Sequence, residues 1–266
     1  MALRLDGNIL VTGANRGIGL ELVKQLAEKT GKGAHVYAAC RDPQGDRSQV
    51  LRNLITLHPG KITVIQLDMA HEDSISAAVE VLRQKTGAGG LKVLINNAAI
   101  NKPDPPAPLS VTGKKDMMEV YETNVAGPFI LTKMLLPLLQ RAAKTPSADK
   151  DHGDELSCRR SAVINVSTIF SSVEKCPETF TLAQVYPYRT SKAALNMLTR
   201  CQAEDFKADG ILVAAIHPGW VQTDMGGDQA PLSTQDSVLG MLNVMSTLSS
   251  KDTGMLLDWE GSRIPW

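Results

Sequence analysis

The chain has 266 residues, of which 43% are hydrophobic and 21% are charged, and its formal net charge at pH 7 is zero. This composition is typical of an ordinary globular protein that buries a sizeable core, and the balanced charge argues against a nucleic-acid partner. No apolar run approaches the ~20 residues that a membrane span needs, so we expect no membrane partner.

Short apolar runs alternate with amphipathic stretches of helical length along the chain. Strands are predicted at 8–13, 35–41, 62–68, 92–98, 161–167, 211–219 and 253–259. Helices are predicted at 17–31, 46–58, 72–87 and 186–208, with one long helix or two in sequence over 114–140. The strand runs are continuously apolar, which indicates strands covered on both faces, as in a parallel sheet. The pattern predicts an α/β fold: one doubly wound Rossmann-type domain over 1–266, with a mostly parallel seven-stranded sheet flanked by helices.

Two stretches interrupt this alternation. Residues 144–160 are polar and lie between a helix and the fifth strand, so we expect an exposed insertion there. Residues 173–187 form a long segment directly before the helix at 186–208, and loops of that length often bind ligands or act as lids.

A glycine-rich sequence, TGANRGIG at 12–19, follows the first strand and opens the first helix. This is the context in which such a turn binds a dinucleotide. Gly13 permits a tight turn, Gly17 lets the backbone approach a pyrophosphate, and Gly19 lets the helix pack on the sheet. The N–H groups and the positive dipole end of the helix then favour phosphate.

The end of the second strand predicts which dinucleotide binds. An NAD site commonly has an acid there that binds the ribose 2′-hydroxyl, whereas an NADP site lacks the acid and supplies a cation. Here the strand ends in AACRD, with Cys40 at the discriminating position and Arg41 beside it. Arg41 and Arg16 can both face a 2′-phosphate, although Asp42 could pair with Arg41. We therefore predict NADPH (NADP in its oxidised form) as the cofactor.

Six motifs occur in a fixed order: TGxxxGxG, NNA after the fourth strand, an asparagine in a mid-chain helix, NVS after the fifth strand, YxxxK, and PG followed by T after the sixth strand. As a set they resemble the short-chain dehydrogenase/reductase family over essentially the whole chain. Within that family, YRTSKAALN, HPGWVQTDMGG and the ending PW are most similar to the C-factor and sniffer group of carbonyl reductases.

The resemblance implies a role for individual residues. It implies that the catalytic residues are Asn124, Thr168, Tyr188 and Lys192. It implies that the cofactor-binding residues are Gly13, Asn15, Arg16, Gly17, Ile18, Gly19, Arg41, Asp68, Met69, Asn97, Ala98, Tyr188, Lys192, Pro218, Gly219, Val221 and Thr223. The usual NNAG is NNAA here, with Ala99 in place of glycine.

The catalytic hydroxyl is a departure from the family pattern. The family usually has two serines after the fifth strand and uses the second, but this chain reads NVSTIF, which puts Thr168 at that position. Threonine can still donate to a carbonyl, although its methyl group narrows the pocket. Ser167 could serve instead if the strand end is twisted, and Ser171 or Ser172 are further alternatives.

The spacing of Tyr188 and Lys192 suits a proton donor. The two residues are four apart and share one helix face. A free tyrosine has a pKa of about 10, and a nearby ammonium group is expected to lower it. The hydroxyl of Thr168 would polarise the carbonyl oxygen beside the phenol.

We therefore predict an NADPH-dependent reductase of a small carbonyl compound: an aldehyde, a ketone or a quinone. An NAD-linked alcohol dehydrogenase and a non-catalytic NADP(H)-binding regulator are alternatives. Specificity is expected in the loops at 100–112, 170–187 and 225–240, whose sequences do not name a substrate. The resemblance also implies a homodimer or homotetramer that pairs through the helices at 114–140 and 186–208.

The four cysteines are scattered and form no CxxC pair. Their spacing predicts free thiols in a reducing compartment and no metal site. The first residues, MALRLDGNILVTG, run almost at once into a strand and lack the layout of a signal peptide. We therefore expect a cytoplasmic protein.

Overall fold

The computed structural model describes residues 5–31, 33–105, 107–145 and 156–266. Within these residues, seven strands form one sheet in the order β3-β2-β1-β4-β5-β6-β7, and every neighbouring pair is parallel. The strands are β1 (Gly7–Thr12), β2 (Ala34–Cys40), β3 (Ile62–Gln66), β4 (Val93–Asn96), β5 (Ala162–Val166), β6 (Leu212–His217) and β7 (Leu256–Asp258). The predicted doubly wound α/β fold is confirmed, with parallel pairing throughout the described sheet.

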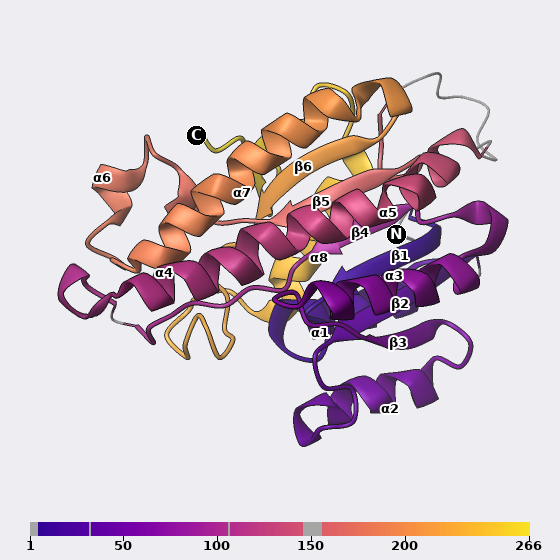
Figure 1. Cartoon of the computed structure of the whole chain (residues 1–266), viewed down its shortest axis with the longest axis horizontal. Helices are drawn as coiled ribbons and strands as arrows, with labels where there is room; N and C mark the ends of the chain where they lie inside the picture. The colour runs from indigo at the N-terminus through magenta and orange to yellow at the C-terminus, as the bar shows by residue number, and fades with distance from the viewer. Residues whose placement is uncertain (1–4, 32, 106, 146–155) are drawn as a thin grey trace.

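Helices cover both faces of the sheet (Figure 1). They are α1 (Gly17–Lys29), α2 (Gln49–Leu57), α3 (Glu72–Lys85), α4 (Lys114–Tyr121), α5 (Gly127–Lys144), α6 (Cys176–Thr179), α7 (Tyr186–Asp205) and α8 (Thr234–Thr247). Helices α1, α2 and α8 pack into one apolar core, and α3, α5 and α7 pack into the other. No described helix combines the length and apolar character needed to cross a membrane.

The two cores explain why the strand sequences are continuously apolar. Ile9 and Leu10 are neighbours on β1, and neither is exposed to solvent. Ile9 belongs to the core that contains Leu22 of α1, whereas Leu10 belongs to the core that contains Leu135 of α5. Because successive strand side chains point to opposite faces, burial on both faces requires apolar residues at consecutive positions.

The mid-chain helix predicted over 114–140 is two α-helices joined by a π-helical turn. Helix α4 leads without a break into the π turn at Glu122–Ala126, and α5 follows directly. A π turn inside a helix is rare and often marks a functional position. Asn124, which the sequence predicts to be catalytic, lies in this turn.

Other predicted segments differ from the structure in detail. The predicted loop at 225–240 ends early, because α8 begins at Thr234 and packs its apolar side against α1. The segment at 173–187 contains the short helix α6, and α7 begins at Tyr186. All four cysteines are free thiols, as predicted. Most of the predicted polar insertion, 146–155, lies outside the described residues.

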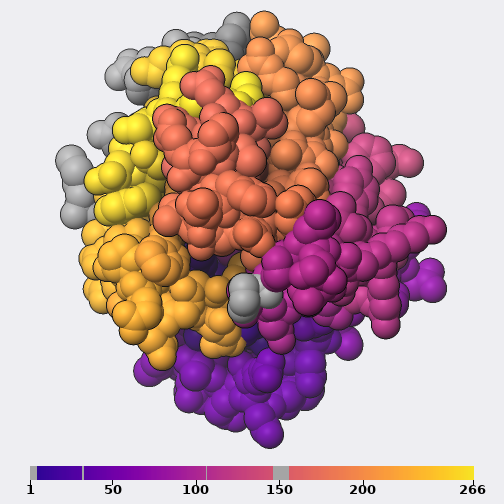
Figure 2. Space-filling model, turned by 90° about the vertical axis from the view of Figure 1, so that its left-hand side faces the viewer, coloured from indigo at the N-terminus to yellow at the C-terminus, as the bar shows by residue number. Residues whose placement is uncertain are grey.

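The strand order reverses between β1 and β4, and ligands of such sheets bind beyond the carboxyl ends of the strands at this point. Figure 2 looks onto this edge of the molecule. The segment around α6, the segment leading into α4 and the β6–α8 loop surround a hollow there. This hollow is the place where the predicted site residues should meet.

Candidate active site

The glycine-rich turn between β1 and α1 has the geometry that a dinucleotide requires. Gly13 and Gly17 have φ values of +65° and +52°. A Cβ on Gly19 would lie 2.1 Å from the Gly13 carbonyl oxygen, so only glycine fits there. The N-cap residue Arg16 makes no side-chain cap, and the first turn of α1 carries no acid. This helix end is therefore suited to a phosphate group.

The ends of β1 and β4 are joined beside this turn. The Thr12 hydroxyl accepts hydrogen bonds from the backbone N–H groups of Asn97 and Ala98, both at 3.0 Å. In return, Asn97 Nδ2 donates to the carbonyl oxygens of Thr12 and Gly13, at 2.9 and 3.2 Å. These bonds hold the NNAA segment against the glycine-rich turn, so the two motifs form one wall.

A cavity of about 530 Å³ lies over this edge of the sheet. Its size is within the usual range for small-molecule and cofactor sites. Most of the predicted site residues line it: Gly13, Asn15, Arg16, Gly17, Ile18, Gly19, Arg41, Asp68, Met69, Asn97, Ala98, Tyr188, Lys192, Pro218 and Thr223. Segments far apart in the sequence are thus brought to one cavity, and these residues fit a dinucleotide.

Four predicted residues are not part of the cavity wall. Asn124 is fully buried behind it, Thr168 is 6% exposed, and Val221 is buried in a bridge to Leu232. Gly219 has a φ of +85°, and a Cβ there would approach a Leu232 methyl carbon to 2.7 Å. Asn124, Thr168 and Gly219 each directly follow a residue of the wall.

Some wall residues were not assigned to the site from sequence: Leu67, Ala70, His71, Ala99, Glu119, Glu122, Thr123, Val166 and Asp224. The wall also contains Cys40, which the sequence placed at the discriminating position, and Ser167, the alternative catalytic hydroxyl. Ile100, Lys102 and Met225 lie in the predicted specificity loops at 100–112 and 225–240. Glu119 has no signal in the sequence, because its helix meets Lys102 only in the folded chain.

The cavity rim carries charged pairs. Arg16 Nη1 lies 2.5 Å from Asp224 Oδ2, and both side chains are exposed. Lys102 Nζ lies 2.6 Å from Glu119 Oε2 across the loop that precedes α4. Among the described residues, no group of three His, Cys, Asp or Glu side chains could hold a metal ion.

The end of β2 presents a free cationic side chain. Asp42 was a possible partner for Arg41, but its Oδ1 instead accepts from the Gly45 backbone N–H at 2.9 Å. No ion pair between Asp42 and Arg41 occurs in the described part of the chain, and Arg41 is exposed. Burial raises the pKa of the neighbouring Cys40 thiol, so that side chain stays neutral. The strand end is therefore suited to a 2′-phosphate.

Tyr188 and Lys192 lie one turn apart at the start of α7. Lys192 is 2% exposed, and its Nζ donates to the Val166 carbonyl oxygen at 2.7 Å. Nζ lies 5.8 Å from the centre of the Tyr188 ring. Burial lowers the pKa of Lys192 to about 7 and raises the pKa of Tyr188 to about 12.

This result corrects the expectation that Lys192 lowers the pKa of Tyr188. Desolvation disfavours the charged form of each group, and here it outweighs their mutual attraction. The phenol consequently keeps its proton throughout the physiological pH range, which is the protonation state of a proton donor.

Asn124 joins three parts of the site. Its Nδ2 donates to the Ile100 carbonyl oxygen at 2.9 Å and to Ser191 Oγ at 3.1 Å, and its Oδ1 accepts from the Ile100 N–H at 2.9 Å. Ile100 lines the cavity, and Ser191 precedes Lys192 on α7. The π turn therefore fixes the loop after β4 against the helix that carries Tyr188.

Three hydroxyl groups meet at the end of β5. Ser167 Oγ donates to Asn196 Oδ1 at 2.6 Å and contacts Ser171 Oγ at 3.2 Å. Ser171 Oγ donates to the Thr168 carbonyl oxygen. Thr168 Oγ1 accepts from the Phe170 backbone N–H at 3.2 Å and donates in no described hydrogen bond. A hydroxyl has one proton to donate, so Thr168 keeps its proton available, whereas Ser167 uses its own.

The comparisons with known proteins identify the family. The family model for short chain dehydrogenases matches residues 7–232. The chain belongs to the short-chain dehydrogenase family.

Several relatives of this short-chain dehydrogenase resemble it over most of their length. The C-signal protein of Myxococcus xanthus is 35% identical over 178 residues, which cover 67% of this chain and 94% of that protein. An NADPH-bound carbonyl reductase from chicken fatty liver is 41% identical, with a TM-score of 0.90, covering 98% of this chain and 95% of that one. The carbonyl reductase Sniffer of D. melanogaster is 32% identical, with a TM-score of 0.88, covering 98% and 100%.

In this short-chain dehydrogenase, the segment before α7 is anchored by Arg189. The buried guanidinium donates to the carbonyl oxygens of Thr179 and Ala183, at 2.5 and 2.8 Å. Its carbon lies 4.5 Å from the Phe170 ring centre and 5.7 Å from that of Phe180. The residue next to Tyr188 thus connects the segment around α6 to the start of α7.

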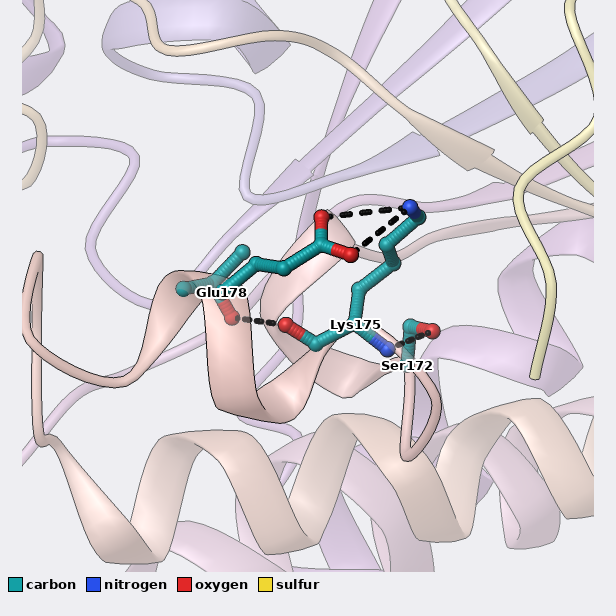
Figure 3. A network of polar contacts seen from close by, with 4 residues as sticks. Ser172, Lys175 and Glu178 are labelled. Atoms are coloured by element: carbon teal, nitrogen blue, oxygen red, sulfur yellow. Dashed lines mark hydrogen bonds and ion pairs between the residues drawn. The ribbon is translucent and has the colours of Figure 1, made fainter.

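The segment around α6 also has its own polar network (Figure 3). The Lys175 backbone N–H donates to Ser172 Oγ at 3.0 Å, and Lys175 Nζ lies 3.1 Å from Glu178 Oε2. Thr179 Oγ1 donates to the Lys175 carbonyl oxygen at 2.9 Å. This predicted substrate loop is therefore an organised turn that borders the hollow seen in Figure 2.

Proposed function

We propose that the protein is an NADPH-dependent reductase of a small carbonyl compound, an aldehyde, a ketone or a quinone. The observation that carries the proposal is that a protonated Tyr188 and the buried Lys192 line the same cavity as the glycine-rich turn. The likeness to an NADPH-bound carbonyl reductase at 41% identity supports the same activity.

The chain holds the cofactor with backbone and cationic groups. The turn around Gly13 and the N-terminus of α1 would hold the pyrophosphate, and Arg16 and Arg41 the 2′-phosphate. Asp68 and Met69 would bind near the adenine, and Asn97 and Ala98 near the adenosine ribose. Asn15, Gly17, Ile18 and Gly19 would complete the turn, and Pro218, Gly219, Val221 and Thr223 would bind the nicotinamide end. When bound, the cofactor supplies the hydride.

The protein supplies the proton and the polarity. The Thr168 hydroxyl donates to the substrate carbonyl oxygen, which raises the positive charge on the carbon. Tyr188 transfers its proton to that oxygen as the alkoxide forms. Lys192 Nζ donates to the Val166 carbonyl and makes no other hydrogen bond among the described residues, so a further N–H group would be available to a ribose hydroxyl beside Tyr188. Asn124 holds the helix and the loop after β4 in register.

Assembly and location are part of the proposal. Helices α4, α5 and α7 expose apolar side chains at Met118, Tyr121, Phe129 and Met197. Scattered apolar residues are common on surfaces, but their position on these long helices supports pairing of two copies into a homodimer or a dimer of dimers. Four free thiols support a cytoplasmic location. Light scattering coupled to size exclusion tests the assembly, and a mass equal to one chain contradicts it.

The activity is tested by mixing the protein with NADPH and a panel of aldehydes, ketones and quinones, and following absorbance at 340 nm. We expect turnover with NADPH and much weaker turnover with NADH. Equal or better use of NADH together with alcohol oxidation supports an NAD-linked dehydrogenase instead. Tight NADPH binding without turnover of any carbonyl supports a non-catalytic regulator instead. The likeness to a protein named C-signal is the reason to test this alternative.

A further inference from the structure

A third polar residue follows Tyr188 and Lys192 along the same face of α7. Asn196 lies four residues after Lys192, so the three side chains are stacked one turn apart. Asn196 is 4% exposed, and it faces the end of β5. A buried amide side chain normally has hydrogen-bond partners, so the partners of Asn196 indicate its role.

Asn196 bonds to Ser167, which precedes Thr168, and to Ser171, which lies three residues after it. Its Oδ1 accepts the proton of Ser167 at 2.6 Å, and its Nδ2 donates to Ser171 Oγ at 2.7 Å. Ser171 Oγ in turn donates to the Thr168 carbonyl oxygen. The arrangement needs an acceptor and a donor on one short side chain, which asparagine has and aspartate or leucine lacks.

These bonds determine which hydroxyl protons are free. The proton of Ser167 is held by Asn196, and the proton of Ser171 is held by the Thr168 carbonyl oxygen. The Thr168 hydroxyl accepts one bond and donates none among the described residues. The same contacts hold the Thr168 backbone against α7. A second contact between α7 and β5 is the hydrogen bond from Lys192 Nζ to the Val166 carbonyl oxygen.

We propose that Asn196 is a positioning residue for carbonyl reduction, which leaves Thr168 as the hydroxyl donor and holds it at a fixed place relative to Tyr188. This inference rests on the proposed function, because it assigns Asn196 an effect on turnover. Asn196 is not among the residues that line the cavity, so it acts through Ser167, Ser171 and the Thr168 backbone.

A double-mutant cycle tests this inference. Asn196→Leu is made in the wild type and in Thr168→Ala, and kcat, KM and the Kd of NADPH are measured for each. In the wild type we expect kcat to fall between about 10-fold and 100-fold, with the Kd of NADPH changed by less than about twofold. In the Thr168→Ala background we expect Asn196→Leu to change kcat by less than about twofold, because the group that it positions is gone.

The matched control is Thr199→Val, one turn further along α7. Thr199 is fully buried and accepts a hydrogen bond from Asn165 Nδ2 at 2.8 Å. Its loss should lower the free energy of unfolding, as Asn196→Leu does, without lowering kcat. If Asn196→Leu does not fold, Ser171→Ala removes the link to Thr168 from the other side, and the same cycle is run with it.

The outcomes separate this inference from the proposed function. An equal fall in kcat in both backgrounds, or no fall in the wild type, overturns the role of Asn196. Ser167→Ala removes one of the two bonds of Asn196 but leaves the Thr168 hydroxyl, so kcat should fall by less than it does in Thr168→Ala; a loss as large as that of Thr168→Ala overturns the proton assignment. A wild-type protein that binds NADPH but reduces no carbonyl overturns the proposed function, and the role of Asn196 with it.

Discussion

Two groups of polar side chains lie in opposite surroundings: the buried network of Lys192, Asn124 and Asn196 with their hydrogen-bond partners, and the exposed ion pairs at the rim of the cavity. Lys192, Asn124 and Asn196 are at most 4% exposed. The side chains of Arg16 and Asp224 are 46% and 73% exposed. Interactions between buried groups are weakly screened, whereas exposed ion pairs contribute little and weaken with salt.

Position in the fold sets how strongly each polar group affects pKa values and stability. At the start of α7, desolvation is large enough to lower the pKa of Lys192 to about 7 and to raise that of Tyr188 to about 12. At the rim, water and salt compete with every pair, so those charges contribute little to the stability of the fold. We therefore expect large effects from substitutions in the network and small, salt-dependent effects at the rim.

The largest effect is expected from Tyr188→Phe, which removes the proposed proton donor and keeps the ring. Turnover should fall by about 10³-fold, within the range of about 10²–10⁴-fold that general acid–base catalysis contributes. The Kd of NADPH, measured by fluorescence titration, should change by less than about threefold. Retained turnover contradicts the role of Tyr188.

The second-largest loss of kcat is expected from Thr168→Ala, which is compared with Thr168→Ser. Loss of one donor to a developing oxyanion costs about 10²–10³-fold in kcat. Serine keeps the hydroxyl, so Thr168→Ser should stay within about threefold of the wild type. Equal losses in both variants indicate that the methyl group matters rather than the hydroxyl.

His217, a buried titratable group at the carboxyl end of β6, gives a pH prediction. Burial lowers the pKa of His217 to about 4, only partly offset by Asp258, and its Nδ1 has no hydrogen-bond partner among the described residues. The unfolded chain takes up a proton near pH 6.5 and the folded chain only near pH 4, so stability is lost as pH falls between these values. The loss is about 3 kcal/mol at most. Urea unfolding of the wild type and His217→Gln across this range measures it, and equal pH dependence refutes the assignment.

A smaller effect is expected at the end of β2. Arg41→Ala should raise the KM for NADPH by about tenfold and leave the KM for NADH unchanged, because a charge-assisted hydrogen bond is worth about 1.5–3 kcal/mol. The difference should shrink as salt is added. Parallel increases in both KM values show that Arg41 does not contact the 2′-phosphate.

The smallest effect is expected from Asp224→Asn at the rim. Removing the carboxylate frees Arg16 for the cofactor phosphate, so the KM for NADPH should fall by no more than about fivefold. The free energy of unfolding should change by less than about 1 kcal/mol, because the ion pair is exposed. A large loss of stability indicates that the pair holds the β6–α8 loop in place.

Sequence periodicity predicted the parallel sheet because strands buried on both faces must be apolar at consecutive positions, as Ile9 and Leu10 are. The glycine-rich turn was readable because positive φ values and close backbone contacts leave glycine as the residue that fits. The spacing of Tyr188 and Lys192 was readable because a four-residue step is one helical turn. These are local constraints, so the sequence determined them by itself.

The tertiary structure decided what depends on contacts between distant segments. The sequence suggested that Lys192 lowers the pKa of Tyr188, but burial reverses the direction, and burial depends on which elements cover the pair. The hydrogen bonds of Asn196 join α7 to the end of β5, and the Arg16–Asp224 pair joins residues that are 208 apart in the chain. Desolvation and hydrogen-bond partnership are set by packing across the whole molecule, which no local pattern of residues records.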